Sequence, residues 1–414
     1  LPIKSICQIS QNELCLGTDG KGTKIFNIPK QLITDYPFDN NNYLDSGTSK
    51  VHSVLKDNAG NLWIAIYQKG VMMIPAQPNS FKYIGYKSIN KNIIGSNCIT
   101  SLCRDHKGIL WIGTDNDGIY GITTELKQKV HYAPHDSPSS VPSTVFGLYE
   151  DSEHNLWFGS YTNGLGRLDK KTGQCSYLQN LTDKNGNRIQ RVYDLVEDQD
   201  KRLWIATMGA GLFYYDLKTG QSVYDPKFNA ATKKYKWISC LLYAGDNHLY
   251  VGTYDGIRCI DLSTDDFKTE EILSRHIIHS LYEDPQGNIW IGNSEGLAEW
   301  NPQTQQLKTY TTAHGLSSNA VYAIKGDGQD NLWISTNAGM SRFNLNTHTF
   351  SNFYADDGLQ GNEFSKNASF ADHNGILWFG GTNGITYFNP QEITNPAKKW
   401  NVRIIDFYLH DQPI

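Results

Sequence analysis

The chain has 414 residues, of which 39% are hydrophobic and 19% are charged, and its formal net charge is −5 at pH 7. Lysine and arginine are scattered along it and form no basic stripe, which argues against nucleic acid or an acidic membrane surface as a partner. No apolar run reaches the roughly 18 residues of a membrane span and no signal peptide pattern is present, so the sequence as given is expected to be soluble, as a trimmed exported segment would also be.

A short pattern recurs nine times along the chain. In most copies an acidic turn precedes an apolar residue, then a residue that is usually Trp, another apolar residue, and Gly, Ala or Ser. The copies occupy Leu14–Gly17, Leu62–Ala65, Leu110–Gly113, Leu156–Gly159, Leu203–Ala206, Leu249–Gly252, Ile289–Gly292, Leu332–Ser335 and Leu377–Gly380. Their second positions lie 40 to 48 residues apart. A period of roughly 40–50 residues built from short strands is typical of a β-propeller.

Each repeat resolves into four short strands. In the fourth repeat we expect them at 145–150, 156–160, 165–169 and 174–178, because turn residues separate these segments. No segment keeps a helical apolar period for more than a turn or two. The sequence therefore predicts an all-β propeller with very little helix.

The first strand of each repeat carries a column of mostly small residues. Because small side chains let backbones converge, we expect this strand to be innermost, and we expect the Trp of the second strand to fill the wedge between radiating sheets. The small column comprises Ser53, Ser101, Gly147, Asp194, Ser280 and Ala323. A neighbouring column contains His52 and His279, which are expected to be packed or hydrogen-bonded rather than to bind a ligand; its other members are Thr100, Phe146, Tyr193 and Tyr322.

The recurring polar residues are expected to be structural. Aspartates at the start of the tight turns should cap backbone amides; they are Asp57, Asp105, Asp151, Asp198, Asp284, Asp327 and Asp372. Segment Asp115–Gly118 is expected to be a polar turn, because no Glu stands at the twelfth position of a calcium loop. The 12 histidines form no pair at metal-ligand spacing, and most of the seven cysteines are expected to be buried thiols. The sequence predicts no metal and no cofactor.

Segment Ser280–Gly292, which reads Ser-Leu-Tyr-Glu-Asp-Pro-Gln-Gly-Asn-Ile-Trp-Ile-Gly, resembles the two-component regulator propeller repeat. His314–Asn319 and Asp357–Leu359 match the connector that precedes the next inner strand in that family. Beyond Pro390, the segment Val402–Leu409 resembles the opening strand of the triple-tyrosine immunoglobulin-like domain that follows such propellers. The resemblance covers nearly the whole chain. It implies the periplasmic sensor region of a bacterial hybrid two-component system, whose propellers read a glycan fragment and whose membrane helix signals to a histidine kinase.

The resemblance also implies a division of the chain. Because the family typically has fourteen repeats in two seven-bladed rings, residues 1–78 are expected to be the last two blades of a first propeller and residues 79–393 a complete second one. Residues 394–414 would be a linker and the first strand of the next domain. By the same resemblance, the kinase, the membrane helix and the remaining blades would lie outside this sequence. The last repeat lacks a clear fourth strand; either Phe81–Tyr86 supplies it, or that segment ends the second blade.

A ligand site is expected at the mouth of the axial channel, where loops that lead into inner strands meet loops that join second to third strands. The second-to-third loops contribute Tyr161, Met208, Tyr254 and Glu295, and the segments before inner strands contribute Arg191, Lys236, Trp237, Arg275 and His276. Of these, we favour Arg191, Trp237, Tyr254, Tyr161, Met208, Arg275 and His276. Aromatic faces suit sugar rings, and Arg suits sulfate or carboxylate groups. Alternatively, Tyr161 and Tyr254 only cover blade edges.

Three functions follow. The first is a sensory module that binds a glycan-derived oligosaccharide and relays the signal to regulate polysaccharide utilisation. In this case the full-length receptor would self-associate through its ectodomain and meet the membrane only through a helix absent from this chain. The second is a propeller lyase or glycosidase, but glycosidases need paired carboxylates, and the acidic residues here lie chiefly in symmetric turns. The third is a protein-interaction scaffold without catalysis. The sequence favours the first, with no catalytic residues in this segment.

Overall fold

The computed structural model describes residues 2–37, 48–76, 80–86, 92–95, 98–123, 126, 129–183, 185–224, 229, 236–263, 267–393, 408–409 and 412–413. Almost all regular structure in them is β-strand, as predicted. Three 3₁₀ turns of three residues each also occur: η2 (Thr312–His314), η3 (Ala355–Asp357) and η4 (Pro390–Glu392). No helix among these residues has the length and apolar character needed to cross a bilayer.

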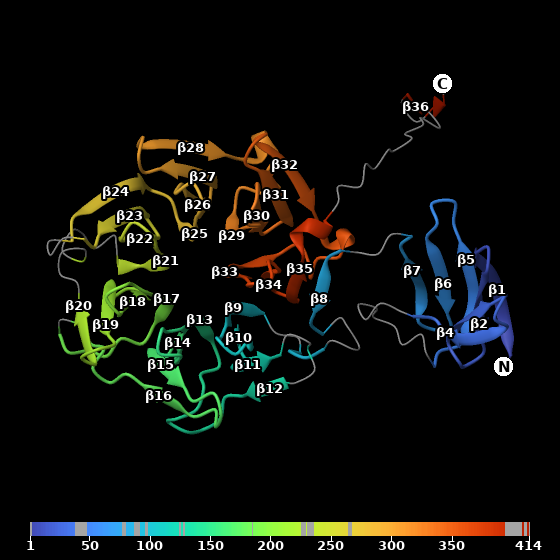
Figure 1. The fold of residues 1–414 in the computed structure, drawn as a ribbon, viewed down its shortest axis with the longest axis horizontal. Helices are drawn as coiled ribbons and strands as arrows, with labels where there is room; N and C mark the ends of the chain where they lie inside the picture. Colours follow the sequence, from blue (N-terminus) through green and yellow to red (C-terminus); the bar gives the residue numbers. More distant parts are fainter. Residues whose placement is uncertain are drawn as a thin grey trace.

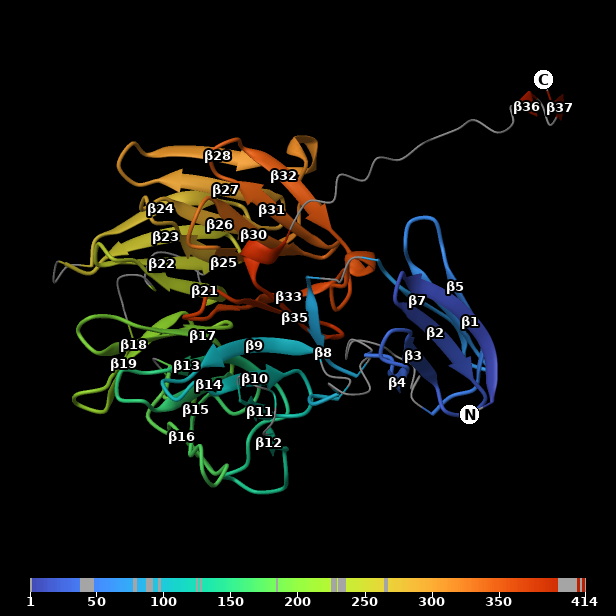
Figure 2. The same cartoon turned by 45° about the vertical axis from the view of Figure 1, so that its right-hand side comes forward.

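Two antiparallel sheets begin the chain. The first contains β1 (Ile3–Ser10), β2 (Glu13–Thr18), β3 (Thr23–Asn27) and β4 (Leu32–Asp35), in that order. The second contains β5 (Val51–Lys56), β6 (Leu62–Ile66) and β7 (Gly70–Ile74). Strand β5 contacts both β1 and β2, so the two sheets stack as neighbouring blades do (Figure 2).

Seven four-stranded sheets follow and surround a common centre (Figure 1). The first three contain β9 (Ile99–Arg104), β10 (Leu110–Thr114), β11 (Ile119–Ile122) and β12 (Lys129–Tyr132); β13 (Val145–Glu150), β14 (Leu156–Ser160), β15 (Leu165–Leu168) and β16 (Cys175–Tyr177); and β17 (Val192–Glu197), β18 (Arg202–Thr207), β19 (Leu212–Asp216) and β20 (Gln221–Tyr224). The next two contain β21 (Ile238–Tyr243), β22 (His248–Thr253), β23 (Gly256–Asp261) and β24 (Thr269–Ser274); and β25 (Ile278–Glu283), β26 (Ile289–Asn293), β27 (Gly296–Asn301) and β28 (Gln306–Tyr310). The last two contain β29 (Val321–Gly326), β30 (Asn331–Thr336), β31 (Met340–Asn344) and β32 (Thr349–Phe353); and β33 (Phe364–Ala371), β34 (Leu377–Gly381), β35 (Gly384–Phe388) and β8 (Lys82–Ile84).

The first strand of each sheet lies innermost, as the small-residue column predicted. Successive inner strands contact one another around the ring, and β33 contacts β9, so the ring is closed. The fold is thus a seven-bladed β-propeller preceded by two further blades.

Strand β8 completes the last blade. Its residue Ile84 is the register partner of Ile385, and Tyr83 is the partner of Thr386. The Tyr83 hydroxyl also donates to the Asn383 carbonyl oxygen, at 2.7 Å. Of the two alternatives for this segment, the one in which it supplies the missing outer strand is therefore confirmed.

The repeated Trp residues of the ring lie between blades. Trp204, Trp290 and Trp333 are among the largest fully buried side chains, and each packs into a hydrophobic cluster with residues of the following blade. The wedge role predicted for this column is confirmed in the ring. Trp63 on β6 differs, because 40% of it is exposed and no described blade follows its sheet.

The turn aspartates cap backbone amides, as predicted. One oxygen of Asp105 accepts from the backbone N–H groups of Lys107 and Ile109, at 3.0 and 2.9 Å. The other accepts from the Trp111 indole N–H at 2.9 Å, a bond that the sequence analysis did not foresee. Burial opposes ionisation of Asp105, but these bonds and the Lys170 ammonium outweigh it and hold its pKa below the usual range.

The seven cysteines are all free thiols, and four of them are buried. Burial raises the pKa of the Cys15 and Cys259 thiols to about 12, so both behave as packed apolar groups. At the C-terminus, β36 (Tyr408–Leu409) pairs with β37 (Gln412–Pro413). Most of the strand expected at 402–409 lies outside the described residues.

Candidate functional site

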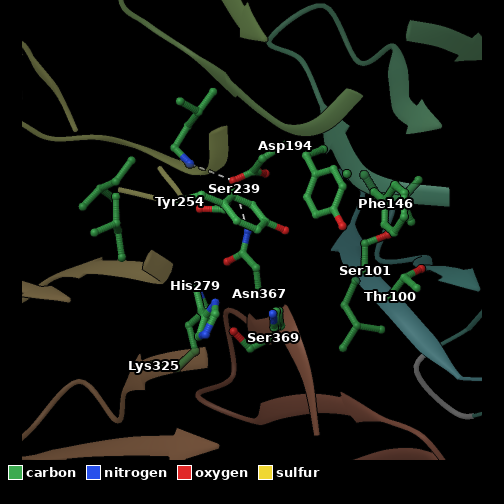
Figure 3. A pocket seen from close by; sticks show the side chains of 18 residues that line it. Thr100, Ser101, Phe146, Asp194, Ser239, Tyr254, His279, Lys325, Asn367 and Ser369 are labelled. Atoms are coloured by element: carbon green, nitrogen blue, oxygen red, sulfur yellow. Dashed lines mark hydrogen bonds between the residues drawn. The ribbon is translucent and has the colours of Figure 1, made fainter. Parts of the chain in front are cut away.

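A cavity of about 210 Å³ lies at the centre of the ring (Figure 3). Five of its lining side chains stand at the same place, the second residue of an inner strand: Thr100, Phe146, Tyr193, Ser239 and His279. In each of these strands the register with the second strand shifts at that residue, which marks a β-bulge or irregularity. A bulge leaves its residue out of the ladder and re-aims the side chain. The sequence therefore folds locally so that this column faces the channel.

A carboxylate in the cavity, that of Asp194, is hydrogen-bonded to a residue of the last blade. Asp194 of β17 accepts hydrogen bonds from the Leu241 backbone N–H at 2.9 Å and from the Asn367 side-chain amide at 3.0 Å (Figure 3). Asn367 lies where the β33–β34 register shifts, and its φ of 54° is a left-handed conformation that Asn tolerates better than most residues. The Asn367–Asp194 bond thus joins two blades through residues that are 173 positions apart in the sequence.

The charged groups of the cavity are strongly perturbed by their surroundings. Burial raises the pKa of Asp194 to about 6, although the hydrogen bonds and the charge of Lys325 oppose the rise. Burial also lowers the pKa of Lys325 and Lys366. His279 is buried near Lys366, and its pKa falls to about 3, so its imidazole is neutral at pH 7. Two lysines and one carboxylate give the cavity a positive balance that suits an anionic ligand group.

A continuous band of side chains leads away from the cavity, and we call it the aromatic band: Arg191, Tyr161, Phe146, Tyr193, Tyr254 and Trp237. The Arg191 guanidinium lies 4.9 Å from the Tyr161 ring centroid, and Phe146 stacks on Tyr193 at 4.3 Å. Burial and the neighbouring Tyr254 side chain raise the pKa of Tyr193. The Tyr254 and Trp237 rings meet edge to face at 5.8 Å.

The structure therefore brings together four of the favoured residues, since Arg191, Tyr161, Trp237 and Tyr254 all belong to the band. Of these four residues, Tyr254 alone also lines the cavity. Tyr161 and Trp237 are each 42% exposed, so their rings remain open to solvent.

The remaining favoured residues lie beside the band. Met208 bridges to Trp237 through the backbone, and its N–H donates to the Arg191 carbonyl oxygen at 3.1 Å. Arg275 donates its backbone N–H to the Asp255 carbonyl oxygen at 3.0 Å and is exposed. The His276 imidazole lies 3.3 Å from the Glu295 carboxylate.

The arrangement suits binding better than hydrolysis. The usual glycosidase mechanisms need two carboxylates that flank the scissile bond. Among the described residues that line the cavity, Asp194 alone is acidic, and its oxygens already accept three hydrogen bonds. Aromatic faces with a nearby Arg and two Lys can instead hold a sugar ring with an anionic substituent.

Sequence reasoning missed the cavity itself. It aligned the column of Phe146, Tyr193 and His279 but assigned none of them to the ligand site, and it expected His279 to be packed or hydrogen-bonded. Asp194 gave a usable signal, because it is the one charged residue in a column of small ones. The channel position of Lys325 and Asn367 carried no such signal, since it depends on strand register and on the bulge in β33.

Comparison with known proteins identifies the repeats. Five segments match the two-component regulator propeller repeat: residues 93–116, 139–162, 183–209, 272–295 and 315–338. They cover five of the nine copies found above, so the chain contains repeats of this family. A curated relative, histidine kinase P4 of Formosa agariphila (strain DSM 15362 / KCTC 12365 / LMG 23005 / KMM 3901 / M-2Alg 35-1), is 24% identical over the whole chain. The chain spans 24% of that relative's length.

Solved structures share the fold. The extracellular domain assigned to the hybrid two-component system BT3049 of B. thetaiotaomicron matches 94% of the chain with a TM-score of 0.76 and 23% identity, over 51% of its own length. The extracellular domain assigned to the hybrid system BT4673 of the same organism matches the whole chain with a TM-score of 0.65 and 20% identity, over 56% of its own length.

Proposed function

We propose that this chain is part of the extracytoplasmic sensor region of a hybrid two-component histidine kinase and that its aromatic band binds a glycan-derived oligosaccharide. The propeller repeats and the similarity to a histidine kinase support the sensor role. The similarity to extracellular domains supports a periplasmic location. Signal relay to polysaccharide utilisation, and self-association of a full-length receptor, belong to the same proposal.

The proposal that the ligand is an anionic oligosaccharide rests on one observation, the aromatic band beside a positively balanced cavity. A cavity of about 210 Å³ is smaller than the roughly 300–1,000 Å³ of pockets that enclose whole drug-sized ligands. We therefore expect one sugar unit or its sulfate or carboxylate group to enter near Lys325 and Lys366. The adjoining sugars would lie on the exposed rings of Trp237 and Tyr161.

Isothermal titration against neutral, uronate-containing and sulfated oligosaccharides tests this proposal. We expect binding of an anionic member without turnover of the sugar. Trp237→Ala should weaken that binding by about 1–3 kcal/mol, a typical loss for an interface anchor. The matched control is Trp63→Ala, because Trp63 is 40% exposed and Trp237 is 42% exposed. Equal affinity of parent and Trp237→Ala would place the site elsewhere, and turnover would favour the lyase or glycosidase alternative.

A further inference from the structure

Two histidines of neighbouring blades lie face to face at the strand ends opposite the channel mouth. His106 belongs to the turn between β9 and β10, and His154 belongs to the turn between β13 and β14. Their ring centroids are 3.8 Å apart, with an angle of 26° between the rings. Both line an open groove of about 820 Å³, so solvent solutes can reach them.

A carboxylate lies beside this pair. Glu150, the last residue of β13, accepts the His106 backbone N–H at 2.6 Å and lies 2.8 Å from the His106 ring nitrogen Nδ1. The Lys170 ammonium also contacts Glu150. One ligand atom from each of His106, Glu150 and His154 lies within 4.8 Å of the others. Sequence spacing could not show this, because the two histidines are 48 residues apart.

The next blade interface shows that the fold does not require these histidines. There the same three positions hold Ser152, Glu197 and Lys201. The Ser152 backbone N–H donates to Glu197 at 2.7 Å, and the Lys201 ammonium lies 3.4 Å from that carboxylate. Thus the link from backbone to carboxylate recurs without an imidazole.

The backbone conformation at His154 is a second indication that blade packing does not require this histidine. His154 has a φ of 67°, a left-handed conformation in which side chains other than Gly are uncommon. Four equivalent turn positions hold glycine at positive φ: Gly60, Gly108, Gly287 and Gly375. A histidine at this place therefore brings a ring to the interface at some conformational cost, and packing of the blades alone does not call for it.

We propose that His106, His154 and Glu150 form a site for a divalent transition-metal ion, with Zn²⁺ as the best match. Two imidazoles and a carboxylate are donors that Zn²⁺ takes in proteins, and three protein ligands leave a position for water. A bound ion would join the sheets β9–β12 and β13–β16. Lys170 competes with the ion for Glu150, so removal of its charge should strengthen binding.

The test is a titration of the untagged chain with ZnCl₂ in chelator-treated buffer, followed by calorimetry and by thermal melting. We expect one ion per chain and a rise of the melting temperature on binding, because the ion binds the folded state. In the double variant His106→Ser/His154→Lys, which copies the next interface, binding should weaken by about tenfold or more. Lys170→Met should bind more tightly than the parent.

Two controls keep the test decisive. His248→Gln removes a half-buried histidine at the start of β22, whose ring nitrogen lies 3.0 Å from the Asp246 carboxylate, and it should leave Zn²⁺ affinity unchanged. If the double variant does not fold, the visible absorption of Co²⁺ bound to the parent should still show nitrogen ligation and should be lost in His154→Lys alone. The proposal is overturned if the parent binds no Zn²⁺, or if the histidine variants bind it as the parent does.

Discussion

Individual side chains stabilise this propeller in two ways, by packing between blades and by forming polar bonds. Trp290 combines both, because its ring is 1% exposed between blades and its indole N–H donates to the Asp284 carboxylate at 2.8 Å. Asp194 instead places an ionisable group in the channel, where hydrogen bonds and the charge of Lys325 only partly offset its burial. The blade interface thus combines ring packing with a polar bond, whereas the axis holds a buried ionisable group.

Replacing Trp290 by Ala should lower the free energy of unfolding by about 3–5 kcal/mol, as large-to-small changes at aromatic core sites do. The loss of ring packing against the β29–β32 sheet is the reason. Chemical denaturation of parent and variant measures it. Trp63→Ala, at a half-exposed site with the same link to a turn aspartate, should cost clearly less. Equal losses at the two sites would show that the wedge position is not decisive.

Asp194→Asn should stabilise the chain more at pH 8 than at pH 5. Burial raises the pKa of Asp194 to about 6, above the value of about 3.9 for unfolded Asp. The folded chain therefore keeps a proton that the unfolded chain releases, so the stability that this group contributes is full below about pH 4 and is lost as the pH rises through about 6. Asn cannot ionise. Thermal melting at both pH values measures the difference, and equal shifts would contradict it.

Strands show where sequence reasoning succeeds and where it stops. The nine copies fix the blades because each repeat carries its own turn and apolar pattern. Strand β8 left two alternatives open, because it has three residues and its partners lie about 300 positions away. The cavity depends on bulges, which arise from the register between two strands and are not marked in either strand alone. The residues favoured for the channel mouth stay a prediction for binding.

Strand β8 should be required for a stable ring. A chain of residues 80–393 keeps it, together with Phe81, whose ring meets Phe388 at 4.9 Å. A chain of residues 92–393 loses both and leaves the edge of β35 unpaired, which favours aggregation. We expect a lower melting temperature and more self-association for the shorter chain, measured by calorimetry and light scattering. Similar behaviour of the two chains would mean that β8 contributes little.

Among the described residues, the molecule consists of a closed ring and two further blades, the second of which has three strands. On the sheet β5–β7, Leu55, Trp63 and Met73 are register partners in one lateral row, and they are 60%, 40% and 46% exposed. Trp residues at the equivalent positions of the ring are covered by the next blade. This exposed row fits the division in which residues 1–78 belong to another propeller.

A double change, Leu55→Glu and Met73→Lys, should therefore reduce self-association of this chain. Its stability should change by no more than about 0.5 kcal/mol per site, as is usual for exposed positions. Light scattering and thermal melting measure both effects. A large drop in melting temperature would indicate that the row is already buried in this chain.

The position of β8 in the sequence also bears on the order in which the ring folds. Residues 82–84 are made before any other strand of the ring, yet their partners 385–387 are made last. Held alone, a loop of about 300 residues costs roughly 5 kcal/mol of chain entropy to close, so β8 has no stable partner until the intervening blades have compacted the chain. We therefore expect the pairing of β8 with β35 to be among the last steps of folding.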